Sequence, residues 1–500
     1  MAEGPAQPGP DRNLRPDLSY PRAVHIVGIG GAGMSAIAGV LLTMGHRVSG
    51  SDAADSDRLR RLAAVGADVH VGHDPRWLGD AEVVAISTAI PASNVEVIEA
   101  DRRGLRVWRR AELLSAICAQ RRTIAVSGTH GKTSTSAMLA VILRQVGLRP
   151  SFIVGGDMVG LRSGAAWEPD GEWLVVEADE SDGTFLDLGA EAVVITSVEP
   201  DHMDFYGDEG SLRQAFVRFA EAAPGQRVMC ADDPGAMSVA ARVGPVTTYG
   251  TSEQAMIRIE GLSLHQGGST FTLAAGRTPL ARVELGVPGV HNARNAAAAI
   301  TMAQTLGVSW TEAGLAVGSY AGVARRFEPR GERDGITFVD DYGHLPGEVA
   351  PTLATAARGW DRVVAVFQPH RYSRTEALWP DFADAFGDAD ILLITDIYPA
   401  GEAPRPGVTG RLISDAVRAA HPAADVRYVP TLDEAACELR RILQPGDLCL
   451  TLGAGDVTTL PDRFVGRDRT PGGGADGPQA PPGPGSAGTG SGSAGTGPDG

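Results

Sequence analysis

Residues 121–147, RRTIAVSGTHGKTSTSAMLAVILRQVG, predict the architecture of the middle of the chain. A short apolar strand, TIAV, runs into the loop SGTHGKTST, which opens the helix SAMLAVILRQ. In phosphate-binding loops of this kind, backbone N–H groups and the helix N-terminus face the phosphates, a lysine reaches the terminal phosphates, and the next hydroxyl binds Mg²⁺. Here those roles fall on Gly128, Gly131, Lys132 and Thr133. The match to GxxxxGK[ST] is incomplete, because Val126 stands at the first glycine position.

Two acidic runs follow later strands of the same part of the chain. EADESDGTF (177–185) begins at the end of one apolar run, and SVEPDHMD (197–204) at the end of the next. Open α/β sheets bind ligands at these strand ends. A carboxylate from Glu177 and a neutral imidazole from His202, facing the phosphate loop, would suit Mg²⁺. Each acidic residue alone could be a solvated surface group, but their joint placement favours a nucleotide and metal site.

A second glycine loop lies near the amino terminus. Gly28-x-Gly30-x-x-Gly33 opens a helix after the strand AVHIV, and Asp52 follows about twenty residues later. The pattern predicts a pyrophosphate on the helix N-terminus and a ribose hydroxyl on the acid. NAD and a nucleotide sugar both present these groups, so the pattern leaves both open.

The last part of the chain carries a cationic group at a predicted strand end. His370, Arg371 and Arg374 lie in FQPHRYSRT (367–375), and arginine suits a two-point grip on a carboxylate. A solvated basic turn is the alternative. Upstream, Arg325 and Arg326 lie in a predicted linker, where an arginine could reach a γ-phosphate.

Strands that alternate with helices indicate the α/β class, with mainly parallel sheets. At roughly 100 to 200 residues per domain, 500 residues predict about three domains. Glycine and proline dominate the last 30 residues, which cannot bury enough apolar surface to offset ordering, so we expect a dispensable disordered tail. The predicted parts are a flexible lead (1–21), three domains (22–120, 121–328 and 329–466) and the tail (467–500).

Composition excludes several classes of protein. A net charge of −17 opposes general nucleic-acid binding. The four cysteines are far apart, which argues against a disulfide framework or a zinc site. Neither a secretory signal nor an apolar run of about 18 residues is present in the sequence, so we expect a cytoplasmic protein with no membrane insertion.

Taken together, these runs resemble the Mur ligase family over roughly residues 22–465. The runs GIGGAGMSAIA, SGTHGKTSTS, EADESDGTF, EPDHMD, GVHNARNAAAA, GVARRFE, DDYGHLP, FQPHRYSR, DIYPAGE and GAGD occur in the family's order. The resemblance implies a Rossmann-like N-terminal domain for a UDP-sugar, a central P-loop-type ATPase, and a Rossmann-like C-terminal domain for an amino acid. The implied reaction joins L-alanine to the carboxylate of UDP-N-acetylmuramate through an acyl phosphate, with ATP and Mg²⁺, in peptidoglycan precursor synthesis.

The resemblance also implies roles for individual residues of this sequence. The UDP-sugar would lie against Gly28, Gly30, Gly31, Ala32, Gly33, Asp52, Ser87, Thr88 and Arg110. ATP would lie against Gly128, Thr129, His130, Gly131, Lys132, Thr133, Ser134, Asn292, Asn295, Arg326 and Asp341. The metal would be held by Thr133, Glu177 and His202. The amino acid would be surrounded by Tyr342, His344, His370, Arg371 and Arg374. The residues expected to act in catalysis are Lys132, Glu177, His202, Arg326, His344, Arg371 and Arg374.

The sequence departs from the family pattern at two positions. Leu345 replaces the second histidine of DDYGHHP, so no role for that imidazole carries over, and Ser197 stands where asparagine is common. Three other functions stay open. A ligase that attaches a whole tripeptide to the same sugar is the close rival, and an NAD-dependent oxidoreductase or a non-catalytic nucleotide-binding regulator are more distant ones.

Overall fold

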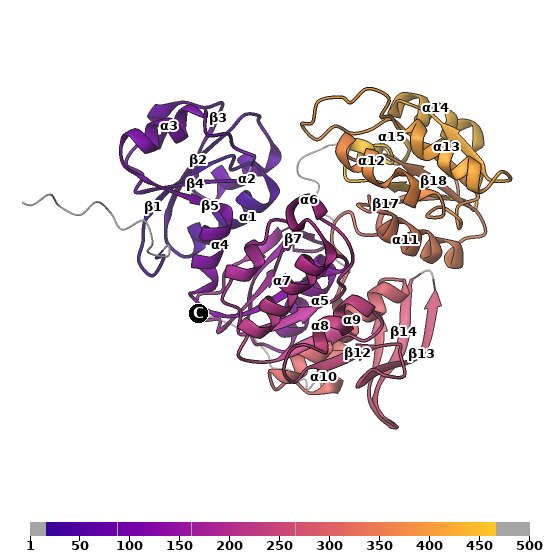
Figure 1. The fold of residues 1–500 in the computed structure, drawn as a ribbon, viewed down its shortest axis with the longest axis horizontal. Coiled ribbons are helices and arrows are strands. Elements are labelled where there is room, and N and C mark those ends of the chain that lie inside the picture. Colours follow the sequence, from indigo (N-terminus) through magenta and orange to yellow (C-terminus); the bar gives the residue numbers. More distant parts are fainter. Residues whose placement is uncertain (1–16, 88, 162, 266, 467–500) are drawn as a thin grey trace, which may run out of the picture. The chain divides into compact units, whose positions relative to one another are not determined.

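A computed structural model describes residues 17–87, 89–161, 163–265 and 267–466. It confirms the α/β class: three sheets follow one another along the chain, of five, ten and six strands (Figure 1). The described residues up to Val465 pack as one compact unit, and the domain boundaries drawn within it stay predictions. The predicted tail (467–500) and residues 1–16 of the predicted lead lie outside the described residues.

The first sheet is entirely parallel, with the strand order β3-β2-β1-β4-β5. Its central strand is buried at every position, which explains the continuous apolar run AVHIV. Because β1 lies between β2 and β4, the glycine loop, Asp52 and Ser87 follow neighbouring strands at one edge of the sheet. The elements are β1 (Ala23–Val27), α1 (Ala32–Thr43), β2 (Arg47–Asp52), α2 (Asp57–Ala64), β3 (Asp68–Val71), η1 (Pro75–Leu78), β4 (Val83–Ile86), α3 (Val95–Arg102), β5 (Arg106–Arg109) and α4 (Arg110–Cys118).

The second sheet has the order β15-β14-β13-β12-β11-β10-β6-β9-β7-β8. Strands β6, β7 and β9 to β13 pair in parallel, whereas β8 and the β13-β14-β15 meander add antiparallel pairs. Since β6 lies between β9 and β10, the phosphate loop and both acidic runs meet at one edge. The elements are β6 (Arg122–Ser127), α5 (Lys132–Gln145), β7 (Ser151–Met158), β8 (Ser163–Ala166), β9 (Trp173–Glu177), η2 (Thr184–Asp187), β10 (Ala192–Ile195), α6 (Met203–Tyr206), α7 (Glu209–Ala222), β11 (Arg227–Cys230), α8 (Pro234–Ala240), β12 (Thr247–Gly250), β13 (Ile257–His265), β14 (Gly268–Ala275), β15 (Thr278–Leu285), α9 (Val290–Thr305), α10 (Trp310–Ala316) and η3 (Val317–Ser319).

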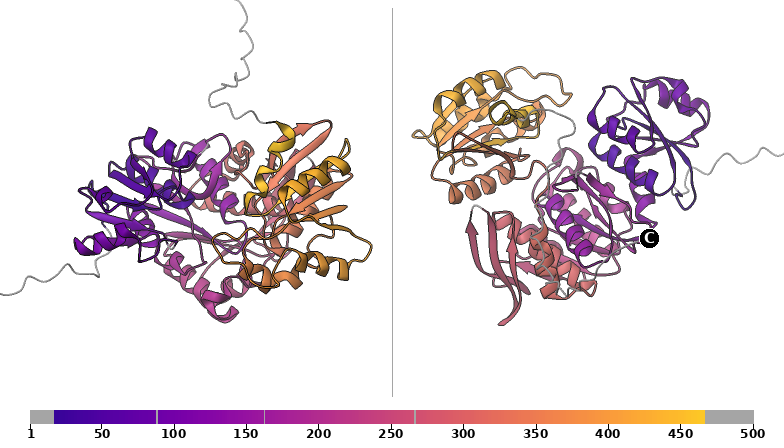
Figure 2. Two further views of the ribbon diagram at one scale, coloured as in Figure 1. Left: turned by 90° about the horizontal axis from the view of Figure 1, so that it is seen from above. Right: turned by 180° about the vertical axis from the view of Figure 1, so that it is seen from behind.

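The third sheet has the order β16-β17-β21-β18-β19-β20, and only its β16-β17 pair is antiparallel. Separate apolar clusters pack α11 and α13 on one face and α14 on the other. Figure 2 shows helices on both sides of this sheet. Because β17, β18, β19 and β21 run in parallel, the loops that follow them lie at one edge of the sheet. The elements are β16 (Glu328–Arg333), β17 (Ile336–Asp341), α11 (Pro346–Gly359), β18 (Val363–Phe367), α12 (Tyr372–Leu378), η4 (Trp379–Phe382), β19 (Ile391–Ile394), α13 (Arg411–Ala420), β20 (Asp425–Tyr428), α14 (Leu432–Ile442), β21 (Leu448–Leu452), η5 (Asp456–Thr459) and α15 (Asp462–Val465).

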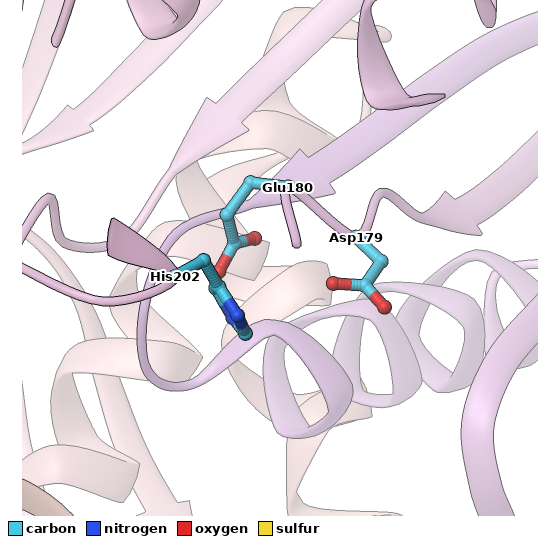
Figure 3. Close-up of side chains that lie close together, drawn as sticks. All are labelled: Asp179, Glu180 and His202. Carbon is cyan, nitrogen blue, oxygen red and sulfur yellow. The ribbon is translucent and has the colours of Figure 1, made fainter. Parts of the chain in front are cut away.

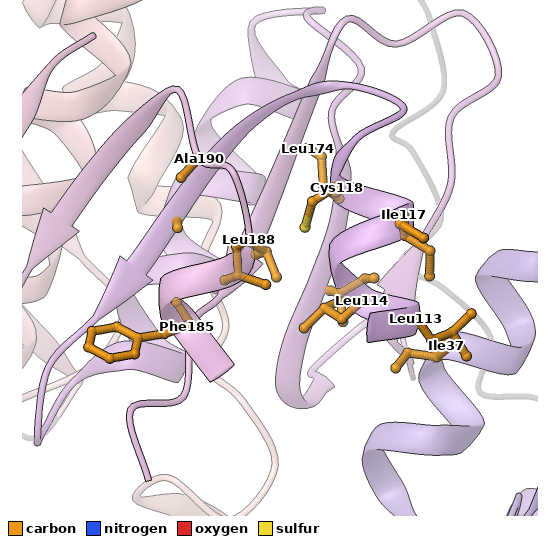
Figure 4. Close-up of a cluster of buried hydrophobic side chains, with 14 of the residues drawn as sticks. Ile37, Leu113, Leu114, Ile117, Cys118, Leu174, Phe185, Leu188 and Ala190 are labelled. Atoms are coloured by element: carbon orange, nitrogen blue, oxygen red, sulfur yellow. The ribbon is translucent and has the colours of Figure 1, made fainter. Parts of the chain in front are cut away.

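One apolar cluster continues from helices α1 and α4 to strand β9 and the turn η2. Ile37, Ile117, Leu174 and Leu188 are buried members of it (Figure 4). Cys118 lies in the same cluster, and burial raises the pKa of its thiol to about 12. All four cysteines are free.

Candidate functional site

The phosphate loop follows a strand and opens a helix, as predicted, and both of its glycines have a positive φ. Gly128 has φ +136°, and a Cβ there would lie 2.2 Å from Oγ1 of Thr196. Gly131 has φ +81°, and a Cβ there would lie 2.6 Å from Oδ1 of Asn295. The backbone N of Ser197, 2.8 Å from the Cβ position of Gly128, excludes a side chain there, whereas at Gly131 the side chain of Asn295 would have to move. The helix α5 then begins at Lys132.

Lys132 is mostly buried at the base of this loop, with its side chain 15% exposed. Its Nζ donates to the carbonyl oxygen of Gly128 at 2.7 Å and to Oε1 of Glu180 at 2.8 Å. Burial opposes the charge, but Glu180 and Asp179 raise the pKa of Lys132, so the ammonium is retained. Lys132 is also the only lysine among the 44 lysines and arginines of the chain. A compact ammonium fits between these acceptors, whereas a planar guanidinium has a different shape.

The three predicted metal ligands fall into two groups. Oγ1 of Thr133 donates to Oε1 of Glu177 at 3.0 Å, and Oε2 of Glu177 accepts the N–H of Gly155 at 2.6 Å. His202 instead lies with Asp179 and Glu180, whose ligand atoms are all within 4.8 Å of one another (Figure 3). Carboxylate and hydroxyl oxygens with one imidazole are donors that fit a hard divalent cation.

The sequence interpretation missed Asp179 and Glu180, although both stand in the quoted run EADESD. The backbone explains why His202 reaches them. His202 has φ +57° and occupies the N-cap position of α6. The hydroxyl of Tyr206, at the other end of that turn, donates to the carbonyl oxygen of Glu180 at 2.5 Å. The two segments are therefore tied together.

The other predicted ATP contacts differ in what their side chains do. Asn295 lies over Gly131, whereas Nδ2 of Asn292 donates to the carbonyl oxygen of Pro288 at 2.7 Å, near the start of its own helix. Both oxygens of Asp341 accept backbone N–H groups, from Phe327 and Gly343, at 2.7 Å each. Burial raises the pKa of Asp341 to about 6.

The two arginines of the predicted linker, Arg325 and Arg326, contact different groups. Arg325 reaches Asp340 and the carbonyl oxygens of the GAGD run, donating to Ala454 at 3.3 Å. Arg326 lies 3.6 Å from Glu348. Arg325 is thus engaged at the C-terminal strand ends, whereas Arg326 lies near the first turn of α11, which carries Glu348.

Asp52 and Arg110, which were predicted to bind the UDP-sugar, both lie against the amino-terminal glycine loop. Oδ2 of Asp52 accepts the N–H of Gly30 at 2.9 Å, so this carboxylate orders the loop itself. A Cβ at Gly33 would lie 3.2 Å from the guanidinium carbon of Arg110, which places that cation over the start of α1. The side chain of Ser87 lies 3.9 Å from the Cβ position of Gly28. Thr88 lies outside the described residues.

The residues predicted to surround the amino acid lie close together, and their rings form a row. The ring of His344 lies 5.4 Å from that of Tyr342 and 5.6 Å from that of His370. The ring of His370 lies 5.8 Å from that of Tyr398, which the sequence interpretation did not select although it belongs to the quoted run DIYPAGE. Nη1 of Arg374 lies 3.0 Å from Nδ1 of His370.

Both histidines of this row are neutral near pH 7. Burial and the neighbouring His344, Arg374 and Arg371 lower the pKa of His370 to about 4, and burial lowers the pKa of His344. Nδ1 of His344 lies 3.1 Å from the carbonyl oxygen of Tyr342. A carbonyl only accepts, so this contact assigns the ring proton to Nδ1 and leaves Nε2 free to accept a proton.

None of the helices in the described part of the chain has the length and apolar character that a membrane span requires. One sheet carries a phosphate loop beside an acidic group, and another carries neutral histidines with arginines. Together these features define an enzyme that uses a nucleotide phosphate to activate a second substrate.

The comparisons with known proteins agree with that class. Three family models match in succession: Mur ligase family, catalytic domain (23–122), Mur ligase middle domain (126–303), and Mur ligase, glutamate ligase domain (325–455). The chain belongs to the Mur ligase family. An oxidoreductase interpretation is not supported, because the family is one of ligases.

Individual relatives cover most of the chain. It is 46% identical to the UDP-N-acetylmuramate–L-alanine ligase of Rubrobacter xylanophilus, over 89% of this chain and 99% of that protein. The corresponding ligase of Syntrophotalea carbinolica is 45% identical, over 87% and 96%. Among solved structures, the UDP-N-acetylmuramate-alanine ligase of Thermotoga maritima has a TM-score of 0.76 at 27% identity, over 89% and 99%.

Proposed function

We propose that the chain is an ATP-dependent ligase of the cytoplasm that joins L-alanine to the carboxylate of UDP-N-acetylmuramate, releasing ADP and phosphate, in peptidoglycan precursor synthesis. The observation that carries the proposal is the phosphate loop with its mostly buried Lys132, in a chain that also has the His344 and His370 group. The similarity over 87 to 89% of the chain to relatives with that printed activity supports the choice of substrates.

The reaction needs activation because a carboxylate is a poor electrophile. Phosphoryl transfer from ATP converts it to an acyl phosphate, which the amine of alanine attacks. Bringing the carboxylate to the γ-phosphate costs about 4 kcal/mol for each pair of unit charges at about 4 Å and an effective dielectric near 20. Lys132 and Arg326 would offset that repulsion. Mg²⁺ held by Thr133, Glu177 and the His202 group would supply further positive charge when bound.

The incoming amine must lose a proton before it attacks, since its reference pKa is about 8. The free Nε2 of His344 is a suitable acceptor, because the ring is neutral and its Nδ1 proton is held by the carbonyl of Tyr342. Arg371 and Arg374 would hold the carboxylate of alanine through paired N–H groups.

Release of phosphate from ATP tests the proposal. It should require UDP-N-acetylmuramate and L-alanine together, and mass spectrometry should find the alanyl product. Release that depends on the tripeptide instead of L-alanine would assign the chain to the tripeptide-attaching ligases. Release with neither amino acid nor tripeptide would contradict the proposal.

A further inference from the structure

Glu348 is a mostly buried carboxylate that the steps above do not use. It stands in the first turn of α11, where its side chain is 13% exposed. Three other helices carry a glutamate at the same third position, and those glutamates are exposed: Glu112, Glu312 and Glu434. Closing the end of a helix needs no burial. The burial of Glu348 therefore points to a role beyond that of a cap.

One oxygen of Glu348 organises the turn that carries His344. Oε2 accepts the N–H of His344 at 2.9 Å and that of Leu345 at 3.3 Å. The same oxygen lies 3.3 Å from Nδ1 of His344. Leu345 occupies the N-cap position but has no side-chain acceptor, so it cannot return a hydrogen bond to the helix. The turn thus depends on Glu348.

The other oxygen faces the cations that lie toward the phosphate loop. Oε1 lies 3.6 Å from Nη1 of Arg326 and 3.9 Å from Nδ1 of His130. That nitrogen of His130 is buried and has no hydrogen-bond partner among the described residues. A Cβ at Gly347 would lie 3.0 Å from Nε2 of His130, so the start of α11 packs directly on this ring.

The surrounding charges explain how a buried carboxylate is tolerated. Burial opposes the charge, but donation from the neutral His344 and the positive charges of His130 and Arg326 hold the pKa of Glu348 well below its usual range. Burial also opposes the charge of His130, but contacts with Glu199 and Glu348 raise its pKa to about 9. Glu348 is therefore charged throughout the range in which the enzyme would act.

We propose that Glu348 is a positioning residue that fixes His344 with one oxygen and Arg326 and His130 with the other, joining the amino-acid group to the phosphate loop. The inference rests on the proposed function for its kinetic consequence. Its effect on His130 does not depend on which substrates the enzyme takes.

Glu348→Gln tests the inference, because glutamine keeps the cap of α11 and removes the charge. Glu434→Gln is the matched control, since Glu434 accepts the N–H of Thr431 at the exposed start of α14. We expect Glu348→Gln to lower kcat at least about tenfold with KM for UDP-N-acetylmuramate changed less than about twofold. In nuclear magnetic resonance titrations, the pKa of His130 should fall. Glu434→Gln should leave both kcat and the pKa of His130 unchanged.

A wild-type kcat together with an unchanged His130 pKa in Glu348→Gln would overturn the inference. If the wild-type chain fails to ligate alanine while the His130 pKa still falls, the proposed function fails and the positioning role stands. Should Glu348→Gln not fold, Glu348→Asp keeps the charge but withdraws it by one methylene. A wild-type kcat in that variant would also overturn the inference, whereas a loss of at least about fivefold would support it.

Discussion

Nζ of Lys132 lies 2.8 Å from Oε1 of Glu180, and the same nitrogen contacts the carbonyl oxygens of Gly128 and Thr129 at 2.7 and 3.4 Å. An ammonium has three N–H donors, so each has a protein acceptor before any phosphate arrives. The side chain is thereby held in place against the loop. A terminal phosphate must replace at least one of these acceptors to bind Lys132.

Lys132→Ala should remove the cation that faces the transferred phosphoryl group. We expect turnover to fall at least about a thousandfold, or about 4 kcal/mol at 1.36 kcal/mol per tenfold change, with the fold retained. Steady-state kinetics and circular dichroism would measure the two effects. Lys132→Arg keeps the charge but not the shape, and it should also lose at least about tenfold. Activity of Lys132→Ala within tenfold of wild type would remove the residue from its role.

The single lysine allows a direct test of where the nucleotide binds. Lys132 and the amino terminus are the only primary alkyl amines available to an amine-directed acylating reagent, because the other 43 residues of the lysine and arginine total are arginines. We expect ATP to slow the modification of Lys132 and to leave that of the terminal amine unchanged, as followed by peptide mass spectrometry. Equal rates with and without saturating ATP would place the phosphates elsewhere.

His130 should make stability depend on pH. Its pKa is about 9 in the folded chain and about 6.5 in the unfolded chain, so the folded state binds its proton more tightly. The resulting stabilisation, about 3 kcal/mol at most, is fully present below pH 6.5 and is lost as the pH rises through 9. Urea denaturation of wild type and His130→Asn would measure it as a difference.

That difference in unfolding free energy should be larger at pH 6 than at pH 10, because other titrating groups cancel between the two proteins. A difference that grows with pH would have the opposite sign and would contradict a charged His130. Glu199→Gln should reduce the pH dependence, since its carboxylate lies 3.3 Å from Nε2 of the ring.

Much of the fold was predictable because parallel strands buried on both faces carry continuous apolar runs. AVHIV, TIAV and VVAVF all became fully buried or nearly fully buried strands. The meander of β13 to β15 was not predicted. Buried positions in β13 and in most of β15 alternate with less buried ones, and polar residues interrupt all three strands, so they have no continuous apolar run.

The sequence predicted which loops would meet, but not which side chains within them would contact one another. The order of strands places the phosphate loop between the two acidic runs, as expected from strand ends meeting at one edge. Which carboxylate turns toward His202 depends on local backbone geometry, here φ +57° at His202 itself. Asp52 was expected to face a ribose; its contact with the N–H of Gly30 arises because the glycine loop after β1 lies beside the end of the neighbouring strand β2. The roles of these residues stay predictions.

Alanine variants at Gly131 and Gly147 can separate the effect of backbone strain from the effect of contact with Asn295. The two glycines stand at opposite ends of α5 and have φ +81° and +82°. A Cβ at Gly131 would meet Oδ1 of Asn295, whereas no atom lies within 4 Å of the Cβ position at Gly147. Alanine at either position should cost about 1 to 2 kcal/mol of unfolding free energy from the left-handed backbone.

Gly131→Ala should show an additional loss, because Asn295 must move or the loop must shift. We therefore expect the KM for ATP to rise at least about tenfold in Gly131→Ala and to stay within about twofold of wild type in Gly147→Ala. Thermal denaturation of both variants would confirm that the chain is folded during the kinetic measurement. An equal rise in KM for both would mean that general destabilisation, and not the contact between the phosphate loop and α9, controls nucleotide binding.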